Sequence, residues 1–258
     1  MTGGVYAVAN QKGGVGKTTT ALNLAACLAE AGERTLVVDL DPQANAPSGL
    51  GLRGVRTAHD ETGLSSYDLL DGAPVSEVAL ATRFRNLFVV PSRPELAGAV
   101  VELARRDDGE TYLRRALHGV ADEYAFVFVD CPPSLGPLTV NALAAADRVL
   151  VPVQCEYYAL EGLTQLLHSI ELVRARLNPR LTVAGMLLTM VDVRTRLAAD
   201  VAAELRRAFG TLVLDAMIPR NVRLAEAPSH GVPITAYDPS CAGADAYYRA
   251  AGELIERR

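Results

Sequence analysis

The residues with the clearest chemical potential lie near the N-terminus, in a glycine-rich stretch that carries two lysines and two threonines. Residues 5–9 are predicted to form an apolar strand that enters this stretch, and residues 18–31 a helix that leaves it. Glycines allow main-chain N–H groups to curve around an anion, and the start of a helix adds a partial positive charge. The sequence therefore predicts a phosphate-binding loop made of Lys12, Gly13, Gly14, Val15, Gly16, Lys17, Thr18 and Thr19.

The lysines of this loop are the only two in the chain, and all other basic residues are arginines. An ammonium group on a flexible stem fits a phosphate site where a planar guanidinium would not. We expect Lys17 to reach the β- and γ-phosphate oxygens and the Thr18 hydroxyl to bind Mg²⁺. A glycine-rich turn that only caps a helix is the alternative, but the strand–loop–helix context and the ending Gly16-Lys17-Thr18 favour the phosphate site. The usual pattern has glycine at position 11, where this chain has Gln11.

Three aspartates lie at or just after the ends of predicted strands. Asp39 and Asp41 end the strand predicted at Thr35–Asp39, and Asp130 ends the one predicted at Phe126–Asp130. Open α/β sheets bind ligands at the carboxyl ends of their strands, so we expect Asp130 to hold a water molecule bound to Mg²⁺. Acids at strand ends are also common as helix caps and turn residues, and for Asp39 this alternative is equally open.

Apolar strands alternate with helical patterns along the chain, which predicts a mostly parallel sheet with helices on both faces. Further strands are expected at Leu87–Val90, 148–153, 181–188 and 212–218, and further helices at 94–120, interrupted near residue 108, and at 160–177, 198–209 and Ala242–Glu256. Residues 47–82 contain glycines and short amphipathic pieces such as Ser66–Leu70 and are not assigned. No linker or repeat divides the sequence, so we expect a single doubly wound α/β domain spanning residues 1–258.

The composition excludes several classes of protein. Half of the 258 residues are hydrophobic and 21% are charged, which supplies a sizeable core and does not fit a disordered chain. No apolar run approaches the ~20 residues of a membrane helix, and the first residues lack the features of a secretory signal, so we expect a cytoplasmic protein. The net charge of −5 argues against general coating of nucleic acid but allows a local basic patch. The scattered cysteines and histidines argue against a disulfide framework or a zinc site.

The loop with Gln11, Lys12 and its glycines resembles the deviant Walker A motif of the ParA/MinD family of P-loop ATPases. The similarity extends to VVDLDPQ at residues 37–43, to DCPP at 130–133, which resembles the end of a Walker B strand, and to IPRNVR at 218–223. It thus covers nearly the whole chain. The stretches ANQKGGVGKTTTALNLAA and IPRNVRLAEAPSHG look most like the chromosomal ParA (Soj) branch. One departure is Pro47, where a threonine or a similar residue is expected.

This resemblance implies roles for individual residues. Lys12 would be the signature lysine, which in the family crosses a nucleotide-sandwiched dimer and contacts the phosphates on the partner subunit. Asp41 would orient or activate the attacking water, and Asp39 would support the metal shell. Arg194 and Arg223 match positions that bind DNA in Soj-like proteins, although both could be ordinary solvated arginines. The base-contacting loops of the family match Met190, which could equally be a core residue, and Pro219, Arg220 and Asn221.

The implied function is that of a Mg²⁺-dependent DNA-segregation ATPase. ATP would drive formation of a homodimer, and the dimer would bind double-stranded DNA nonspecifically, which would place the protein at the nucleoid. A ParB-type centromere-binding protein would stimulate hydrolysis and so release the DNA. The sequence does not distinguish a chromosomal from a plasmid system.

Other functions of the same fold remain as alternatives. A MinD-like ATPase recruited to the membrane would need a C-terminal helix with a basic side and a strongly apolar side, whereas here Glu253 and Glu256 offset the arginines. An electron carrier of the nitrogenase-reductase type needs cluster cysteines, and Cys131 has no suitably spaced partner. For a metabolic ligase no second-substrate pocket is identifiable, and a bacterial tyrosine kinase would require a better tyrosine cluster.

Overall fold

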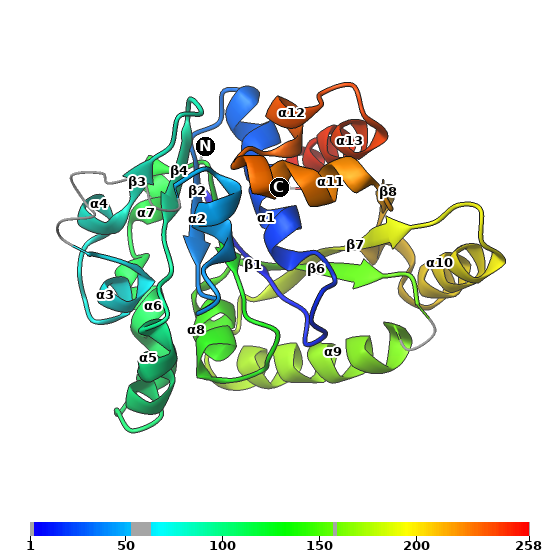
Figure 1. The fold of residues 1–258 in the computed structure, drawn as a ribbon. Coiled ribbons are helices and arrows are strands. Elements are labelled where there is room, and N and C mark those ends of the chain that lie inside the picture. The colour runs from blue at the N-terminus through cyan, green and yellow to red at the C-terminus, as the bar shows by residue number, and fades with distance from the viewer. Residues whose placement is uncertain (1–2, 53–62, 157–158, 258) are drawn as a thin grey trace.

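The computed structural model describes residues 3–52, 63–156 and 159–257, and it confirms the predicted mostly parallel sheet. The strands are β1 (Gly4–Val8), β2 (Thr35–Asp39), β3 (Leu80–Ala81), β4 (Leu87–Val90), β5 (Phe126–Asp130), β6 (Arg148–Gln154), β7 (Thr182–Val191) and β8 (Val213–Pro219). They form one sheet in the order β3-β4-β2-β5-β1-β6-β7-β8 (Figure 1). Only the edge strand β3 runs antiparallel to its neighbour among the described residues.

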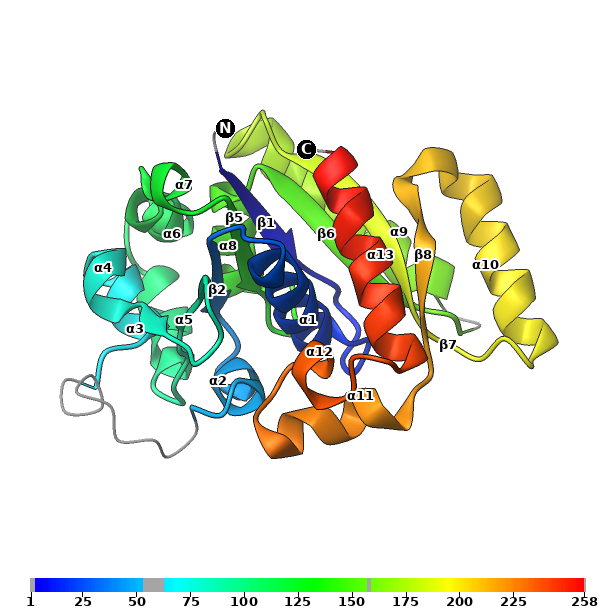
Figure 2. The same ribbon diagram turned by 90° about the horizontal axis from the view of Figure 1, so that it is seen from above.

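Helices cover both faces of this sheet, as Figure 2 shows from above. One face carries α1 (Lys17–Glu30), α2 (Asn45–Gly49), α12 (Ile234–Tyr237) and α13 (Ala242–Glu256). The other carries α3 (Ser66–Leu70), α4 (Val75–Val78), α5 (Leu96–Leu103), α6 (Tyr112–Ala116), α7 (Val120–Glu123), α8 (Pro137–Ala145), α9 (Ala159–Arg176) and α10 (Arg196–Phe209). The short α11 (Val222–Glu226) and the 3₁₀ turn η3 (Ala227–His230) lead from β8 to α12. None of the described helices is both long and apolar enough to cross a membrane.

The central strand β1 shows why the two faces are separate. Successive side chains of a strand point to opposite sides, so Val5 and Ala7 enter one hydrophobic core while Tyr6 and Val8 enter the other. The Tyr6 ring lies 5.5 Å from the ring of Phe128, between centroids, and extends the core beneath α1. A strand that is apolar on both sides is thus buried on both sides, as its sequence predicts.

The register of the sheet brings the predicted site residues to one edge. β1 pairs with β5 on one side and with β6 on the other, so the loop after β1 leaves the middle of the carboxyl edge. β2 pairs with β5 in a register that places Asp39 directly beside Asp130. Two acids that are 91 positions apart in the sequence (130 against 39) therefore become neighbours next to the glycine-rich loop.

Several predicted boundaries need correction. β7 continues to Val191, so Met190 lies inside the strand and not in a loop after it. The helical region predicted at 94–120 is interrupted at Asp108, as expected, where φ is 60°, and it forms separate short helices. The helix α8 was not predicted. In the unassigned region, α2, α3, α4 and β3 form, and residues 53–62 lie outside the described residues.

Candidate active site

The loop between β1 and α1 has the conformation that a phosphate-binding loop requires. Gly14 and Gly16 have φ angles of 73° and 86°, a left-handed region in which residues with a Cβ are strained. Gly16 precedes the first residue of α1. Because glycine has no side chain, no side-chain hydrogen bond caps this end of the helix. The main-chain N–H groups at the start of α1 are therefore available to an anion, which the helix dipole also favours.

The two lysines of the loop point to different places. Lys17 is 7% exposed, and its Nζ donates a hydrogen bond to the carbonyl oxygen of Lys12 at 3.0 Å. Burial lowers the pKa of Lys17, while the Asp130 and Asp41 carboxylates oppose this shift. The Lys12 ammonium is instead half-exposed and forms an ion pair with Glu156. Lys17 therefore remains within its own loop, whereas Lys12 extends away from it.

Asp39 and Asp41 order the segment that follows β2. The main-chain N–H groups of Asp41 and Ala46 donate to the two carboxylate oxygens of Asp39, at 2.9 and 3.1 Å. Burial, and then the neighbouring Asp130 carboxylate, raise the pKa of Asp39 well above its usual range. Asp41 accepts a hydrogen bond from the N–H of Gln43 at 3.0 Å and lines the cavity described below. Asp39 thus fixes the loop on which Asp41 stands.

Asp130 is the most unusual group of the site. It is fully buried, and neither carboxylate oxygen has a hydrogen-bond partner among the described residues. Burial raises the pKa of Asp130 to about 7; the Asp41 carboxylate adds to this rise, while the Thr18 hydroxyl and the Lys17 ammonium oppose it. A buried carboxylate without a partner is costly unless a cation or a hydrogen-bond donor satisfies it.

The surroundings of Asp130 fit Mg²⁺. This ion prefers oxygen ligands, keeps several waters, and is usually held by one or two protein groups together with substrate phosphates. The unsatisfied oxygens of Asp130 and the nearby hydroxyl of Thr18 supply such groups next to the phosphate loop. No cage of three or more acidic, histidine or cysteine side chains exists in the described ranges, and a Mg²⁺ ion bound together with phosphates does not need one.

A cavity of about 450 Å³ opens in front of the loop. Gly13, Gly14, Gly16, Lys17, Thr18 and Thr19 form its floor. Its walls come from residues 41–49, including Asp41 and Gln43, and from residues 227–233, including Pro228 and Pro233. Lys12 and Val15 of the predicted loop are not among the lining residues. Val15 instead uses its carbonyl oxygen to accept a hydrogen bond from the Thr189 hydroxyl at 2.9 Å, which ties the loop to β7.

The wall formed by residues 227–233 was not predicted from the sequence. This segment is held against α1 by Asn23, whose Oδ1 accepts a hydrogen bond from the N–H of Ile234 at 2.7 Å. Its Gly231 lies close to Gly51, which follows the 41–49 wall. Two signals for this wall are present in the sequence, namely the prolines at 228 and 233 and the asparagine at 23 in α1. They are about 200 residues apart, so no local sequence pattern shows that they come together.

The residues expected to contact a nucleotide base lie at the ends of β7 and β8, and none of them lines this cavity. Met190 is partly buried with a φ of 49°, and Pro219 is the last residue of β8. Asn221 caps α11, because its Oδ1 accepts a hydrogen bond from the N–H of Arg223 at 2.8 Å. Arg220 is exposed, and its N–H donates to the carbonyl of Val191 at 3.1 Å. Contact of these four residues with a base stays a prediction.

The two arginines expected to bind DNA lie on neighbouring connections, Arg194 after β7 and Arg223 in α11 after β8. Both are exposed at the surface. DNA binding by these two arginines stays a prediction.

The chain is similar to several known proteins. A family model described as an AAA domain matches residues 3–183. The chain is 51% identical over 249 residues to the chromosome-partitioning ATPase Soj of Treponema pallidum, covering 96% of this chain and 95% of that protein. It is also 51% identical over 253 residues to the sporulation initiation inhibitor protein Soj of Bacillus subtilis, covering 98% of both.

A similar solved structure is that of cobyrinic acid a,c-diamide synthase from Mycobacterium smegmatis with bound ADP and magnesium. It has a TM-score of 0.83 and 38% sequence identity, covering 99% of this chain and 95% of that one. The fold around the loop is thus shared with a protein crystallised with a nucleotide and magnesium.

Proposed function

Because this chain belongs to the family of ParA and Soj chromosome-partitioning ATPases, we propose that it hydrolyses ATP in DNA segregation, with the whole chain working as one ATPase domain. The observation that carries the proposal is that three features occur together: the glycine loop with Lys17, the buried carboxyl group of Asp130 without a hydrogen-bond partner, and the 450 Å³ cavity in front of the loop. The relative solved with ADP and magnesium supports ATP and Mg²⁺ as the cofactors.

The residues of the loop would bind and position the triphosphate. The N–H groups at the start of α1 and the Lys17 ammonium would neutralise the phosphate oxygens, with Lys17 exchanging the Lys12 carbonyl for phosphate. Thr18 and Asp130 would hold Mg²⁺, which neutralises charge that develops on the phosphates. Asp41, on the cavity wall, would orient the attacking water, while Asp39 keeps the Asp41 segment in place.

The family resemblance further supports an ATP-dependent homodimer. Lys12 does not line the cavity of its own chain, and its half-exposed ammonium extends away from the loop. A lysine in this position is free to reach a phosphate on a second subunit once the Glu156 ion pair breaks. In this proposal the dimer binds double-stranded DNA nonspecifically through Arg194 and Arg223 and resides at the nucleoid. A ParB-type partner stimulates ATP hydrolysis and so releases the DNA.

The membrane-recruited alternative is disfavoured by the packing of α13. Its apolar residues Tyr247, Ala250 and Leu254 are buried against the sheet and α1, and the Tyr247 hydroxyl lies 3.3 Å from that of Thr20. The apolar side of this helix is therefore occupied within the protein. A ligase function like that of the solved synthase is less well supported than partitioning, because identity to the Soj relatives is higher, 51% against 38%.

Three variants test the proposal by light scattering and phosphate release with ATP and Mg²⁺. Lys17→Ala should lose nucleotide binding itself. Lys12→Ala should bind ATP as a monomer but fail to dimerise or hydrolyse it. Asp41→Ala should form a stable ATP-bound dimer whose hydrolysis is slower by on the order of a hundred-fold or more, because only the water is mispositioned. A Lys12→Ala protein that dimerises like the wild type would contradict the cross-subunit role, and an Asp41→Ala protein that cannot bind ATP would make Asp41 structural.

A further inference from the structure

Arg194 is held by a carboxylate two positions before it. Its Nε and Nη2 donate hydrogen bonds to the two oxygens of Asp192, both at 2.8 Å, and its main-chain N–H donates to the same carboxylate at 3.1 Å. Hydrogen bonding to Arg194 lowers the pKa of Asp192 to about 2. This bidentate hydrogen-bond geometry is the one in which an arginine also binds a phosphate group.

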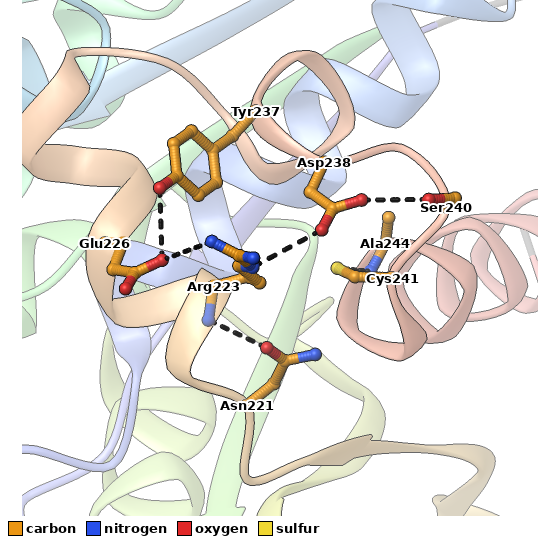
Figure 3. A network of polar contacts seen from close by, with 8 residues as sticks. All are labelled: Asn221, Arg223, Glu226, Tyr237, Asp238, Ser240, Cys241 and Ala244. Carbon is orange, nitrogen blue, oxygen red and sulfur yellow. Dashed lines mark hydrogen bonds and ion pairs between the residues drawn. The ribbon is translucent and has the colours of Figure 1, made fainter.

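Arg223 is held by two carboxylates (Figure 3). Its Nη1 donates to Glu226 at 3.1 Å, and its Nε lies 3.5 Å from an oxygen of Asp238. These carboxylates are fixed in turn, because the Tyr237 hydroxyl donates to Glu226 at 3.1 Å and the Ser240 hydroxyl donates to Asp238 at 3.0 Å. The acceptors around Arg223 are therefore in place before any partner arrives.

The two sites belong to one region of the surface. β7 and β8 are adjacent strands, and the N–H of Arg220 bonds to the carbonyl of Val191, which joins the connections that carry the two arginines. Two guanidinium groups face three carboxylates at these two sites, so the carboxylates offset the positive charge of both arginines. A DNA phosphate that approaches either arginine meets a carboxylate already bound to it.

We propose that Asp192, Glu226 and Asp238 compete with DNA phosphates for Arg194 and Arg223 and thereby set the salt concentration at which the protein releases DNA. The proposal rests on the DNA binding proposed above. Binding would exchange one anion for another at each arginine, and each freed carboxylate would attract a cation from solution. Fewer ions are then released than phosphates contacted, so DNA binding should depend on salt less steeply than the number of arginines suggests.

The test is a salt titration of binding to a fluorescent duplex with ATP, comparing the wild type with Asp192→Asn and Glu226→Gln. Exposed ion pairs are weak, so each substitution should tighten binding by roughly 2- to 30-fold in a dimer and steepen the salt dependence. Asp71→Asn is the matched control, because Asp71 also pairs with an arginine, Arg106, at 3.0 Å, but near the opposite edge of the sheet. The control removes the same charge and should change affinity much less.

A double-mutant cycle separates competition from the general effect of charge. If Asp192 acts through Arg194, Asp192→Asn should have little effect in an Arg194→Ala background. Equal effects in both backgrounds, or equal effects of Asp192→Asn and Asp71→Asn, would overturn the competition. Failure of the wild type to bind DNA with ATP at low salt would instead overturn the proposed DNA binding itself, so the two failures are distinguishable.

Discussion

At the scale of single residues, Asp130 is unusual because its negative charge does not stabilise the ligand-free protein. The group is buried, has no hydrogen-bond partner within the described residues, and lies beside Asp39 in the sheet register. Other buried acids of the site are tied to main-chain N–H groups, as Asp39 is. Such an arrangement stores an electrostatic cost that a bound cation relieves, which is typical of functional sites.

This cost should be measurable as a pH dependence of stability. The folded state holds a proton on Asp130 up to about pH 7, whereas the unfolded chain releases it near pH 4. The unfolded state therefore binds fewer protons in this window, and the ligand-free protein should lose stability as pH rises through it. Relative to the wild type, Asp130→Asn should become more stable by on the order of a few kcal/mol between pH 4.5 and 8. Urea unfolding without nucleotide or Mg²⁺ measures this, and a difference that stays constant with pH would refute it.

At the scale of elements, the apolar strands were predictable from the sequence, and the wall of the site at residues 227–233 was not. An apolar run such as the one in Phe126–Asp130 can be recognised as a strand from sequence, because a strand buried on both faces is apolar along most of its length. The helix α8 was not predicted because it is buried on nearly every side, with Leu138, Ala142 and Leu143 among its buried residues. Such a helix lacks the alternation of apolar and polar residues that identifies an amphipathic helix. The walls at 227–233 and 41–49 lie side by side in the structure although they are far apart in the sequence. A contact of this kind produces no local sequence pattern.

The joint between these two walls should be sensitive to a single methyl group. A Cβ on Gly231 would lie 2.5 Å from the Cα of Gly51, and the φ of Gly231 is 65°. Gly231→Ala should destabilise the protein by about 2–5 kcal/mol and weaken ATP binding several-fold, because strain and overlap both push the walls apart. Gly119→Ala is the control, since Gly119 has a φ of 81° but open space around the added atom. Equal losses of stability in thermal unfolding, or unchanged ATP affinity in Gly231→Ala, would count against a structural joint.

At the scale of the whole molecule, a chain with a net charge of −5 has to gather positive charge to bind DNA. Dimerisation doubles the number of arginines that one duplex meets. Arg194 and Arg223 from two subunits would give a slope of log affinity against log salt of at most roughly −3 to −4, and half of that in a monomer. Binding should require ATP and be equal on unrelated duplexes, as fluorescence anisotropy with ATP, ADP or no nucleotide would measure. Equal binding without nucleotide would move the assignment away from DNA segregation.

The order of strands in the sheet also determines when the pocket can exist during synthesis. β1 is made before the other strands but is flanked by β5 and β6, so one of its edges stays unpaired until β5 is synthesised and the other until β6 is synthesised. Non-local pairing of this kind slows folding and leaves strand edges open to aggregation. The last wall of the pocket, residues 227–233, emerges later still. A nascent chain therefore has its phosphate loop long before it has a complete nucleotide site, and it must complete most of its folding without the stabilisation that a bound nucleotide would give.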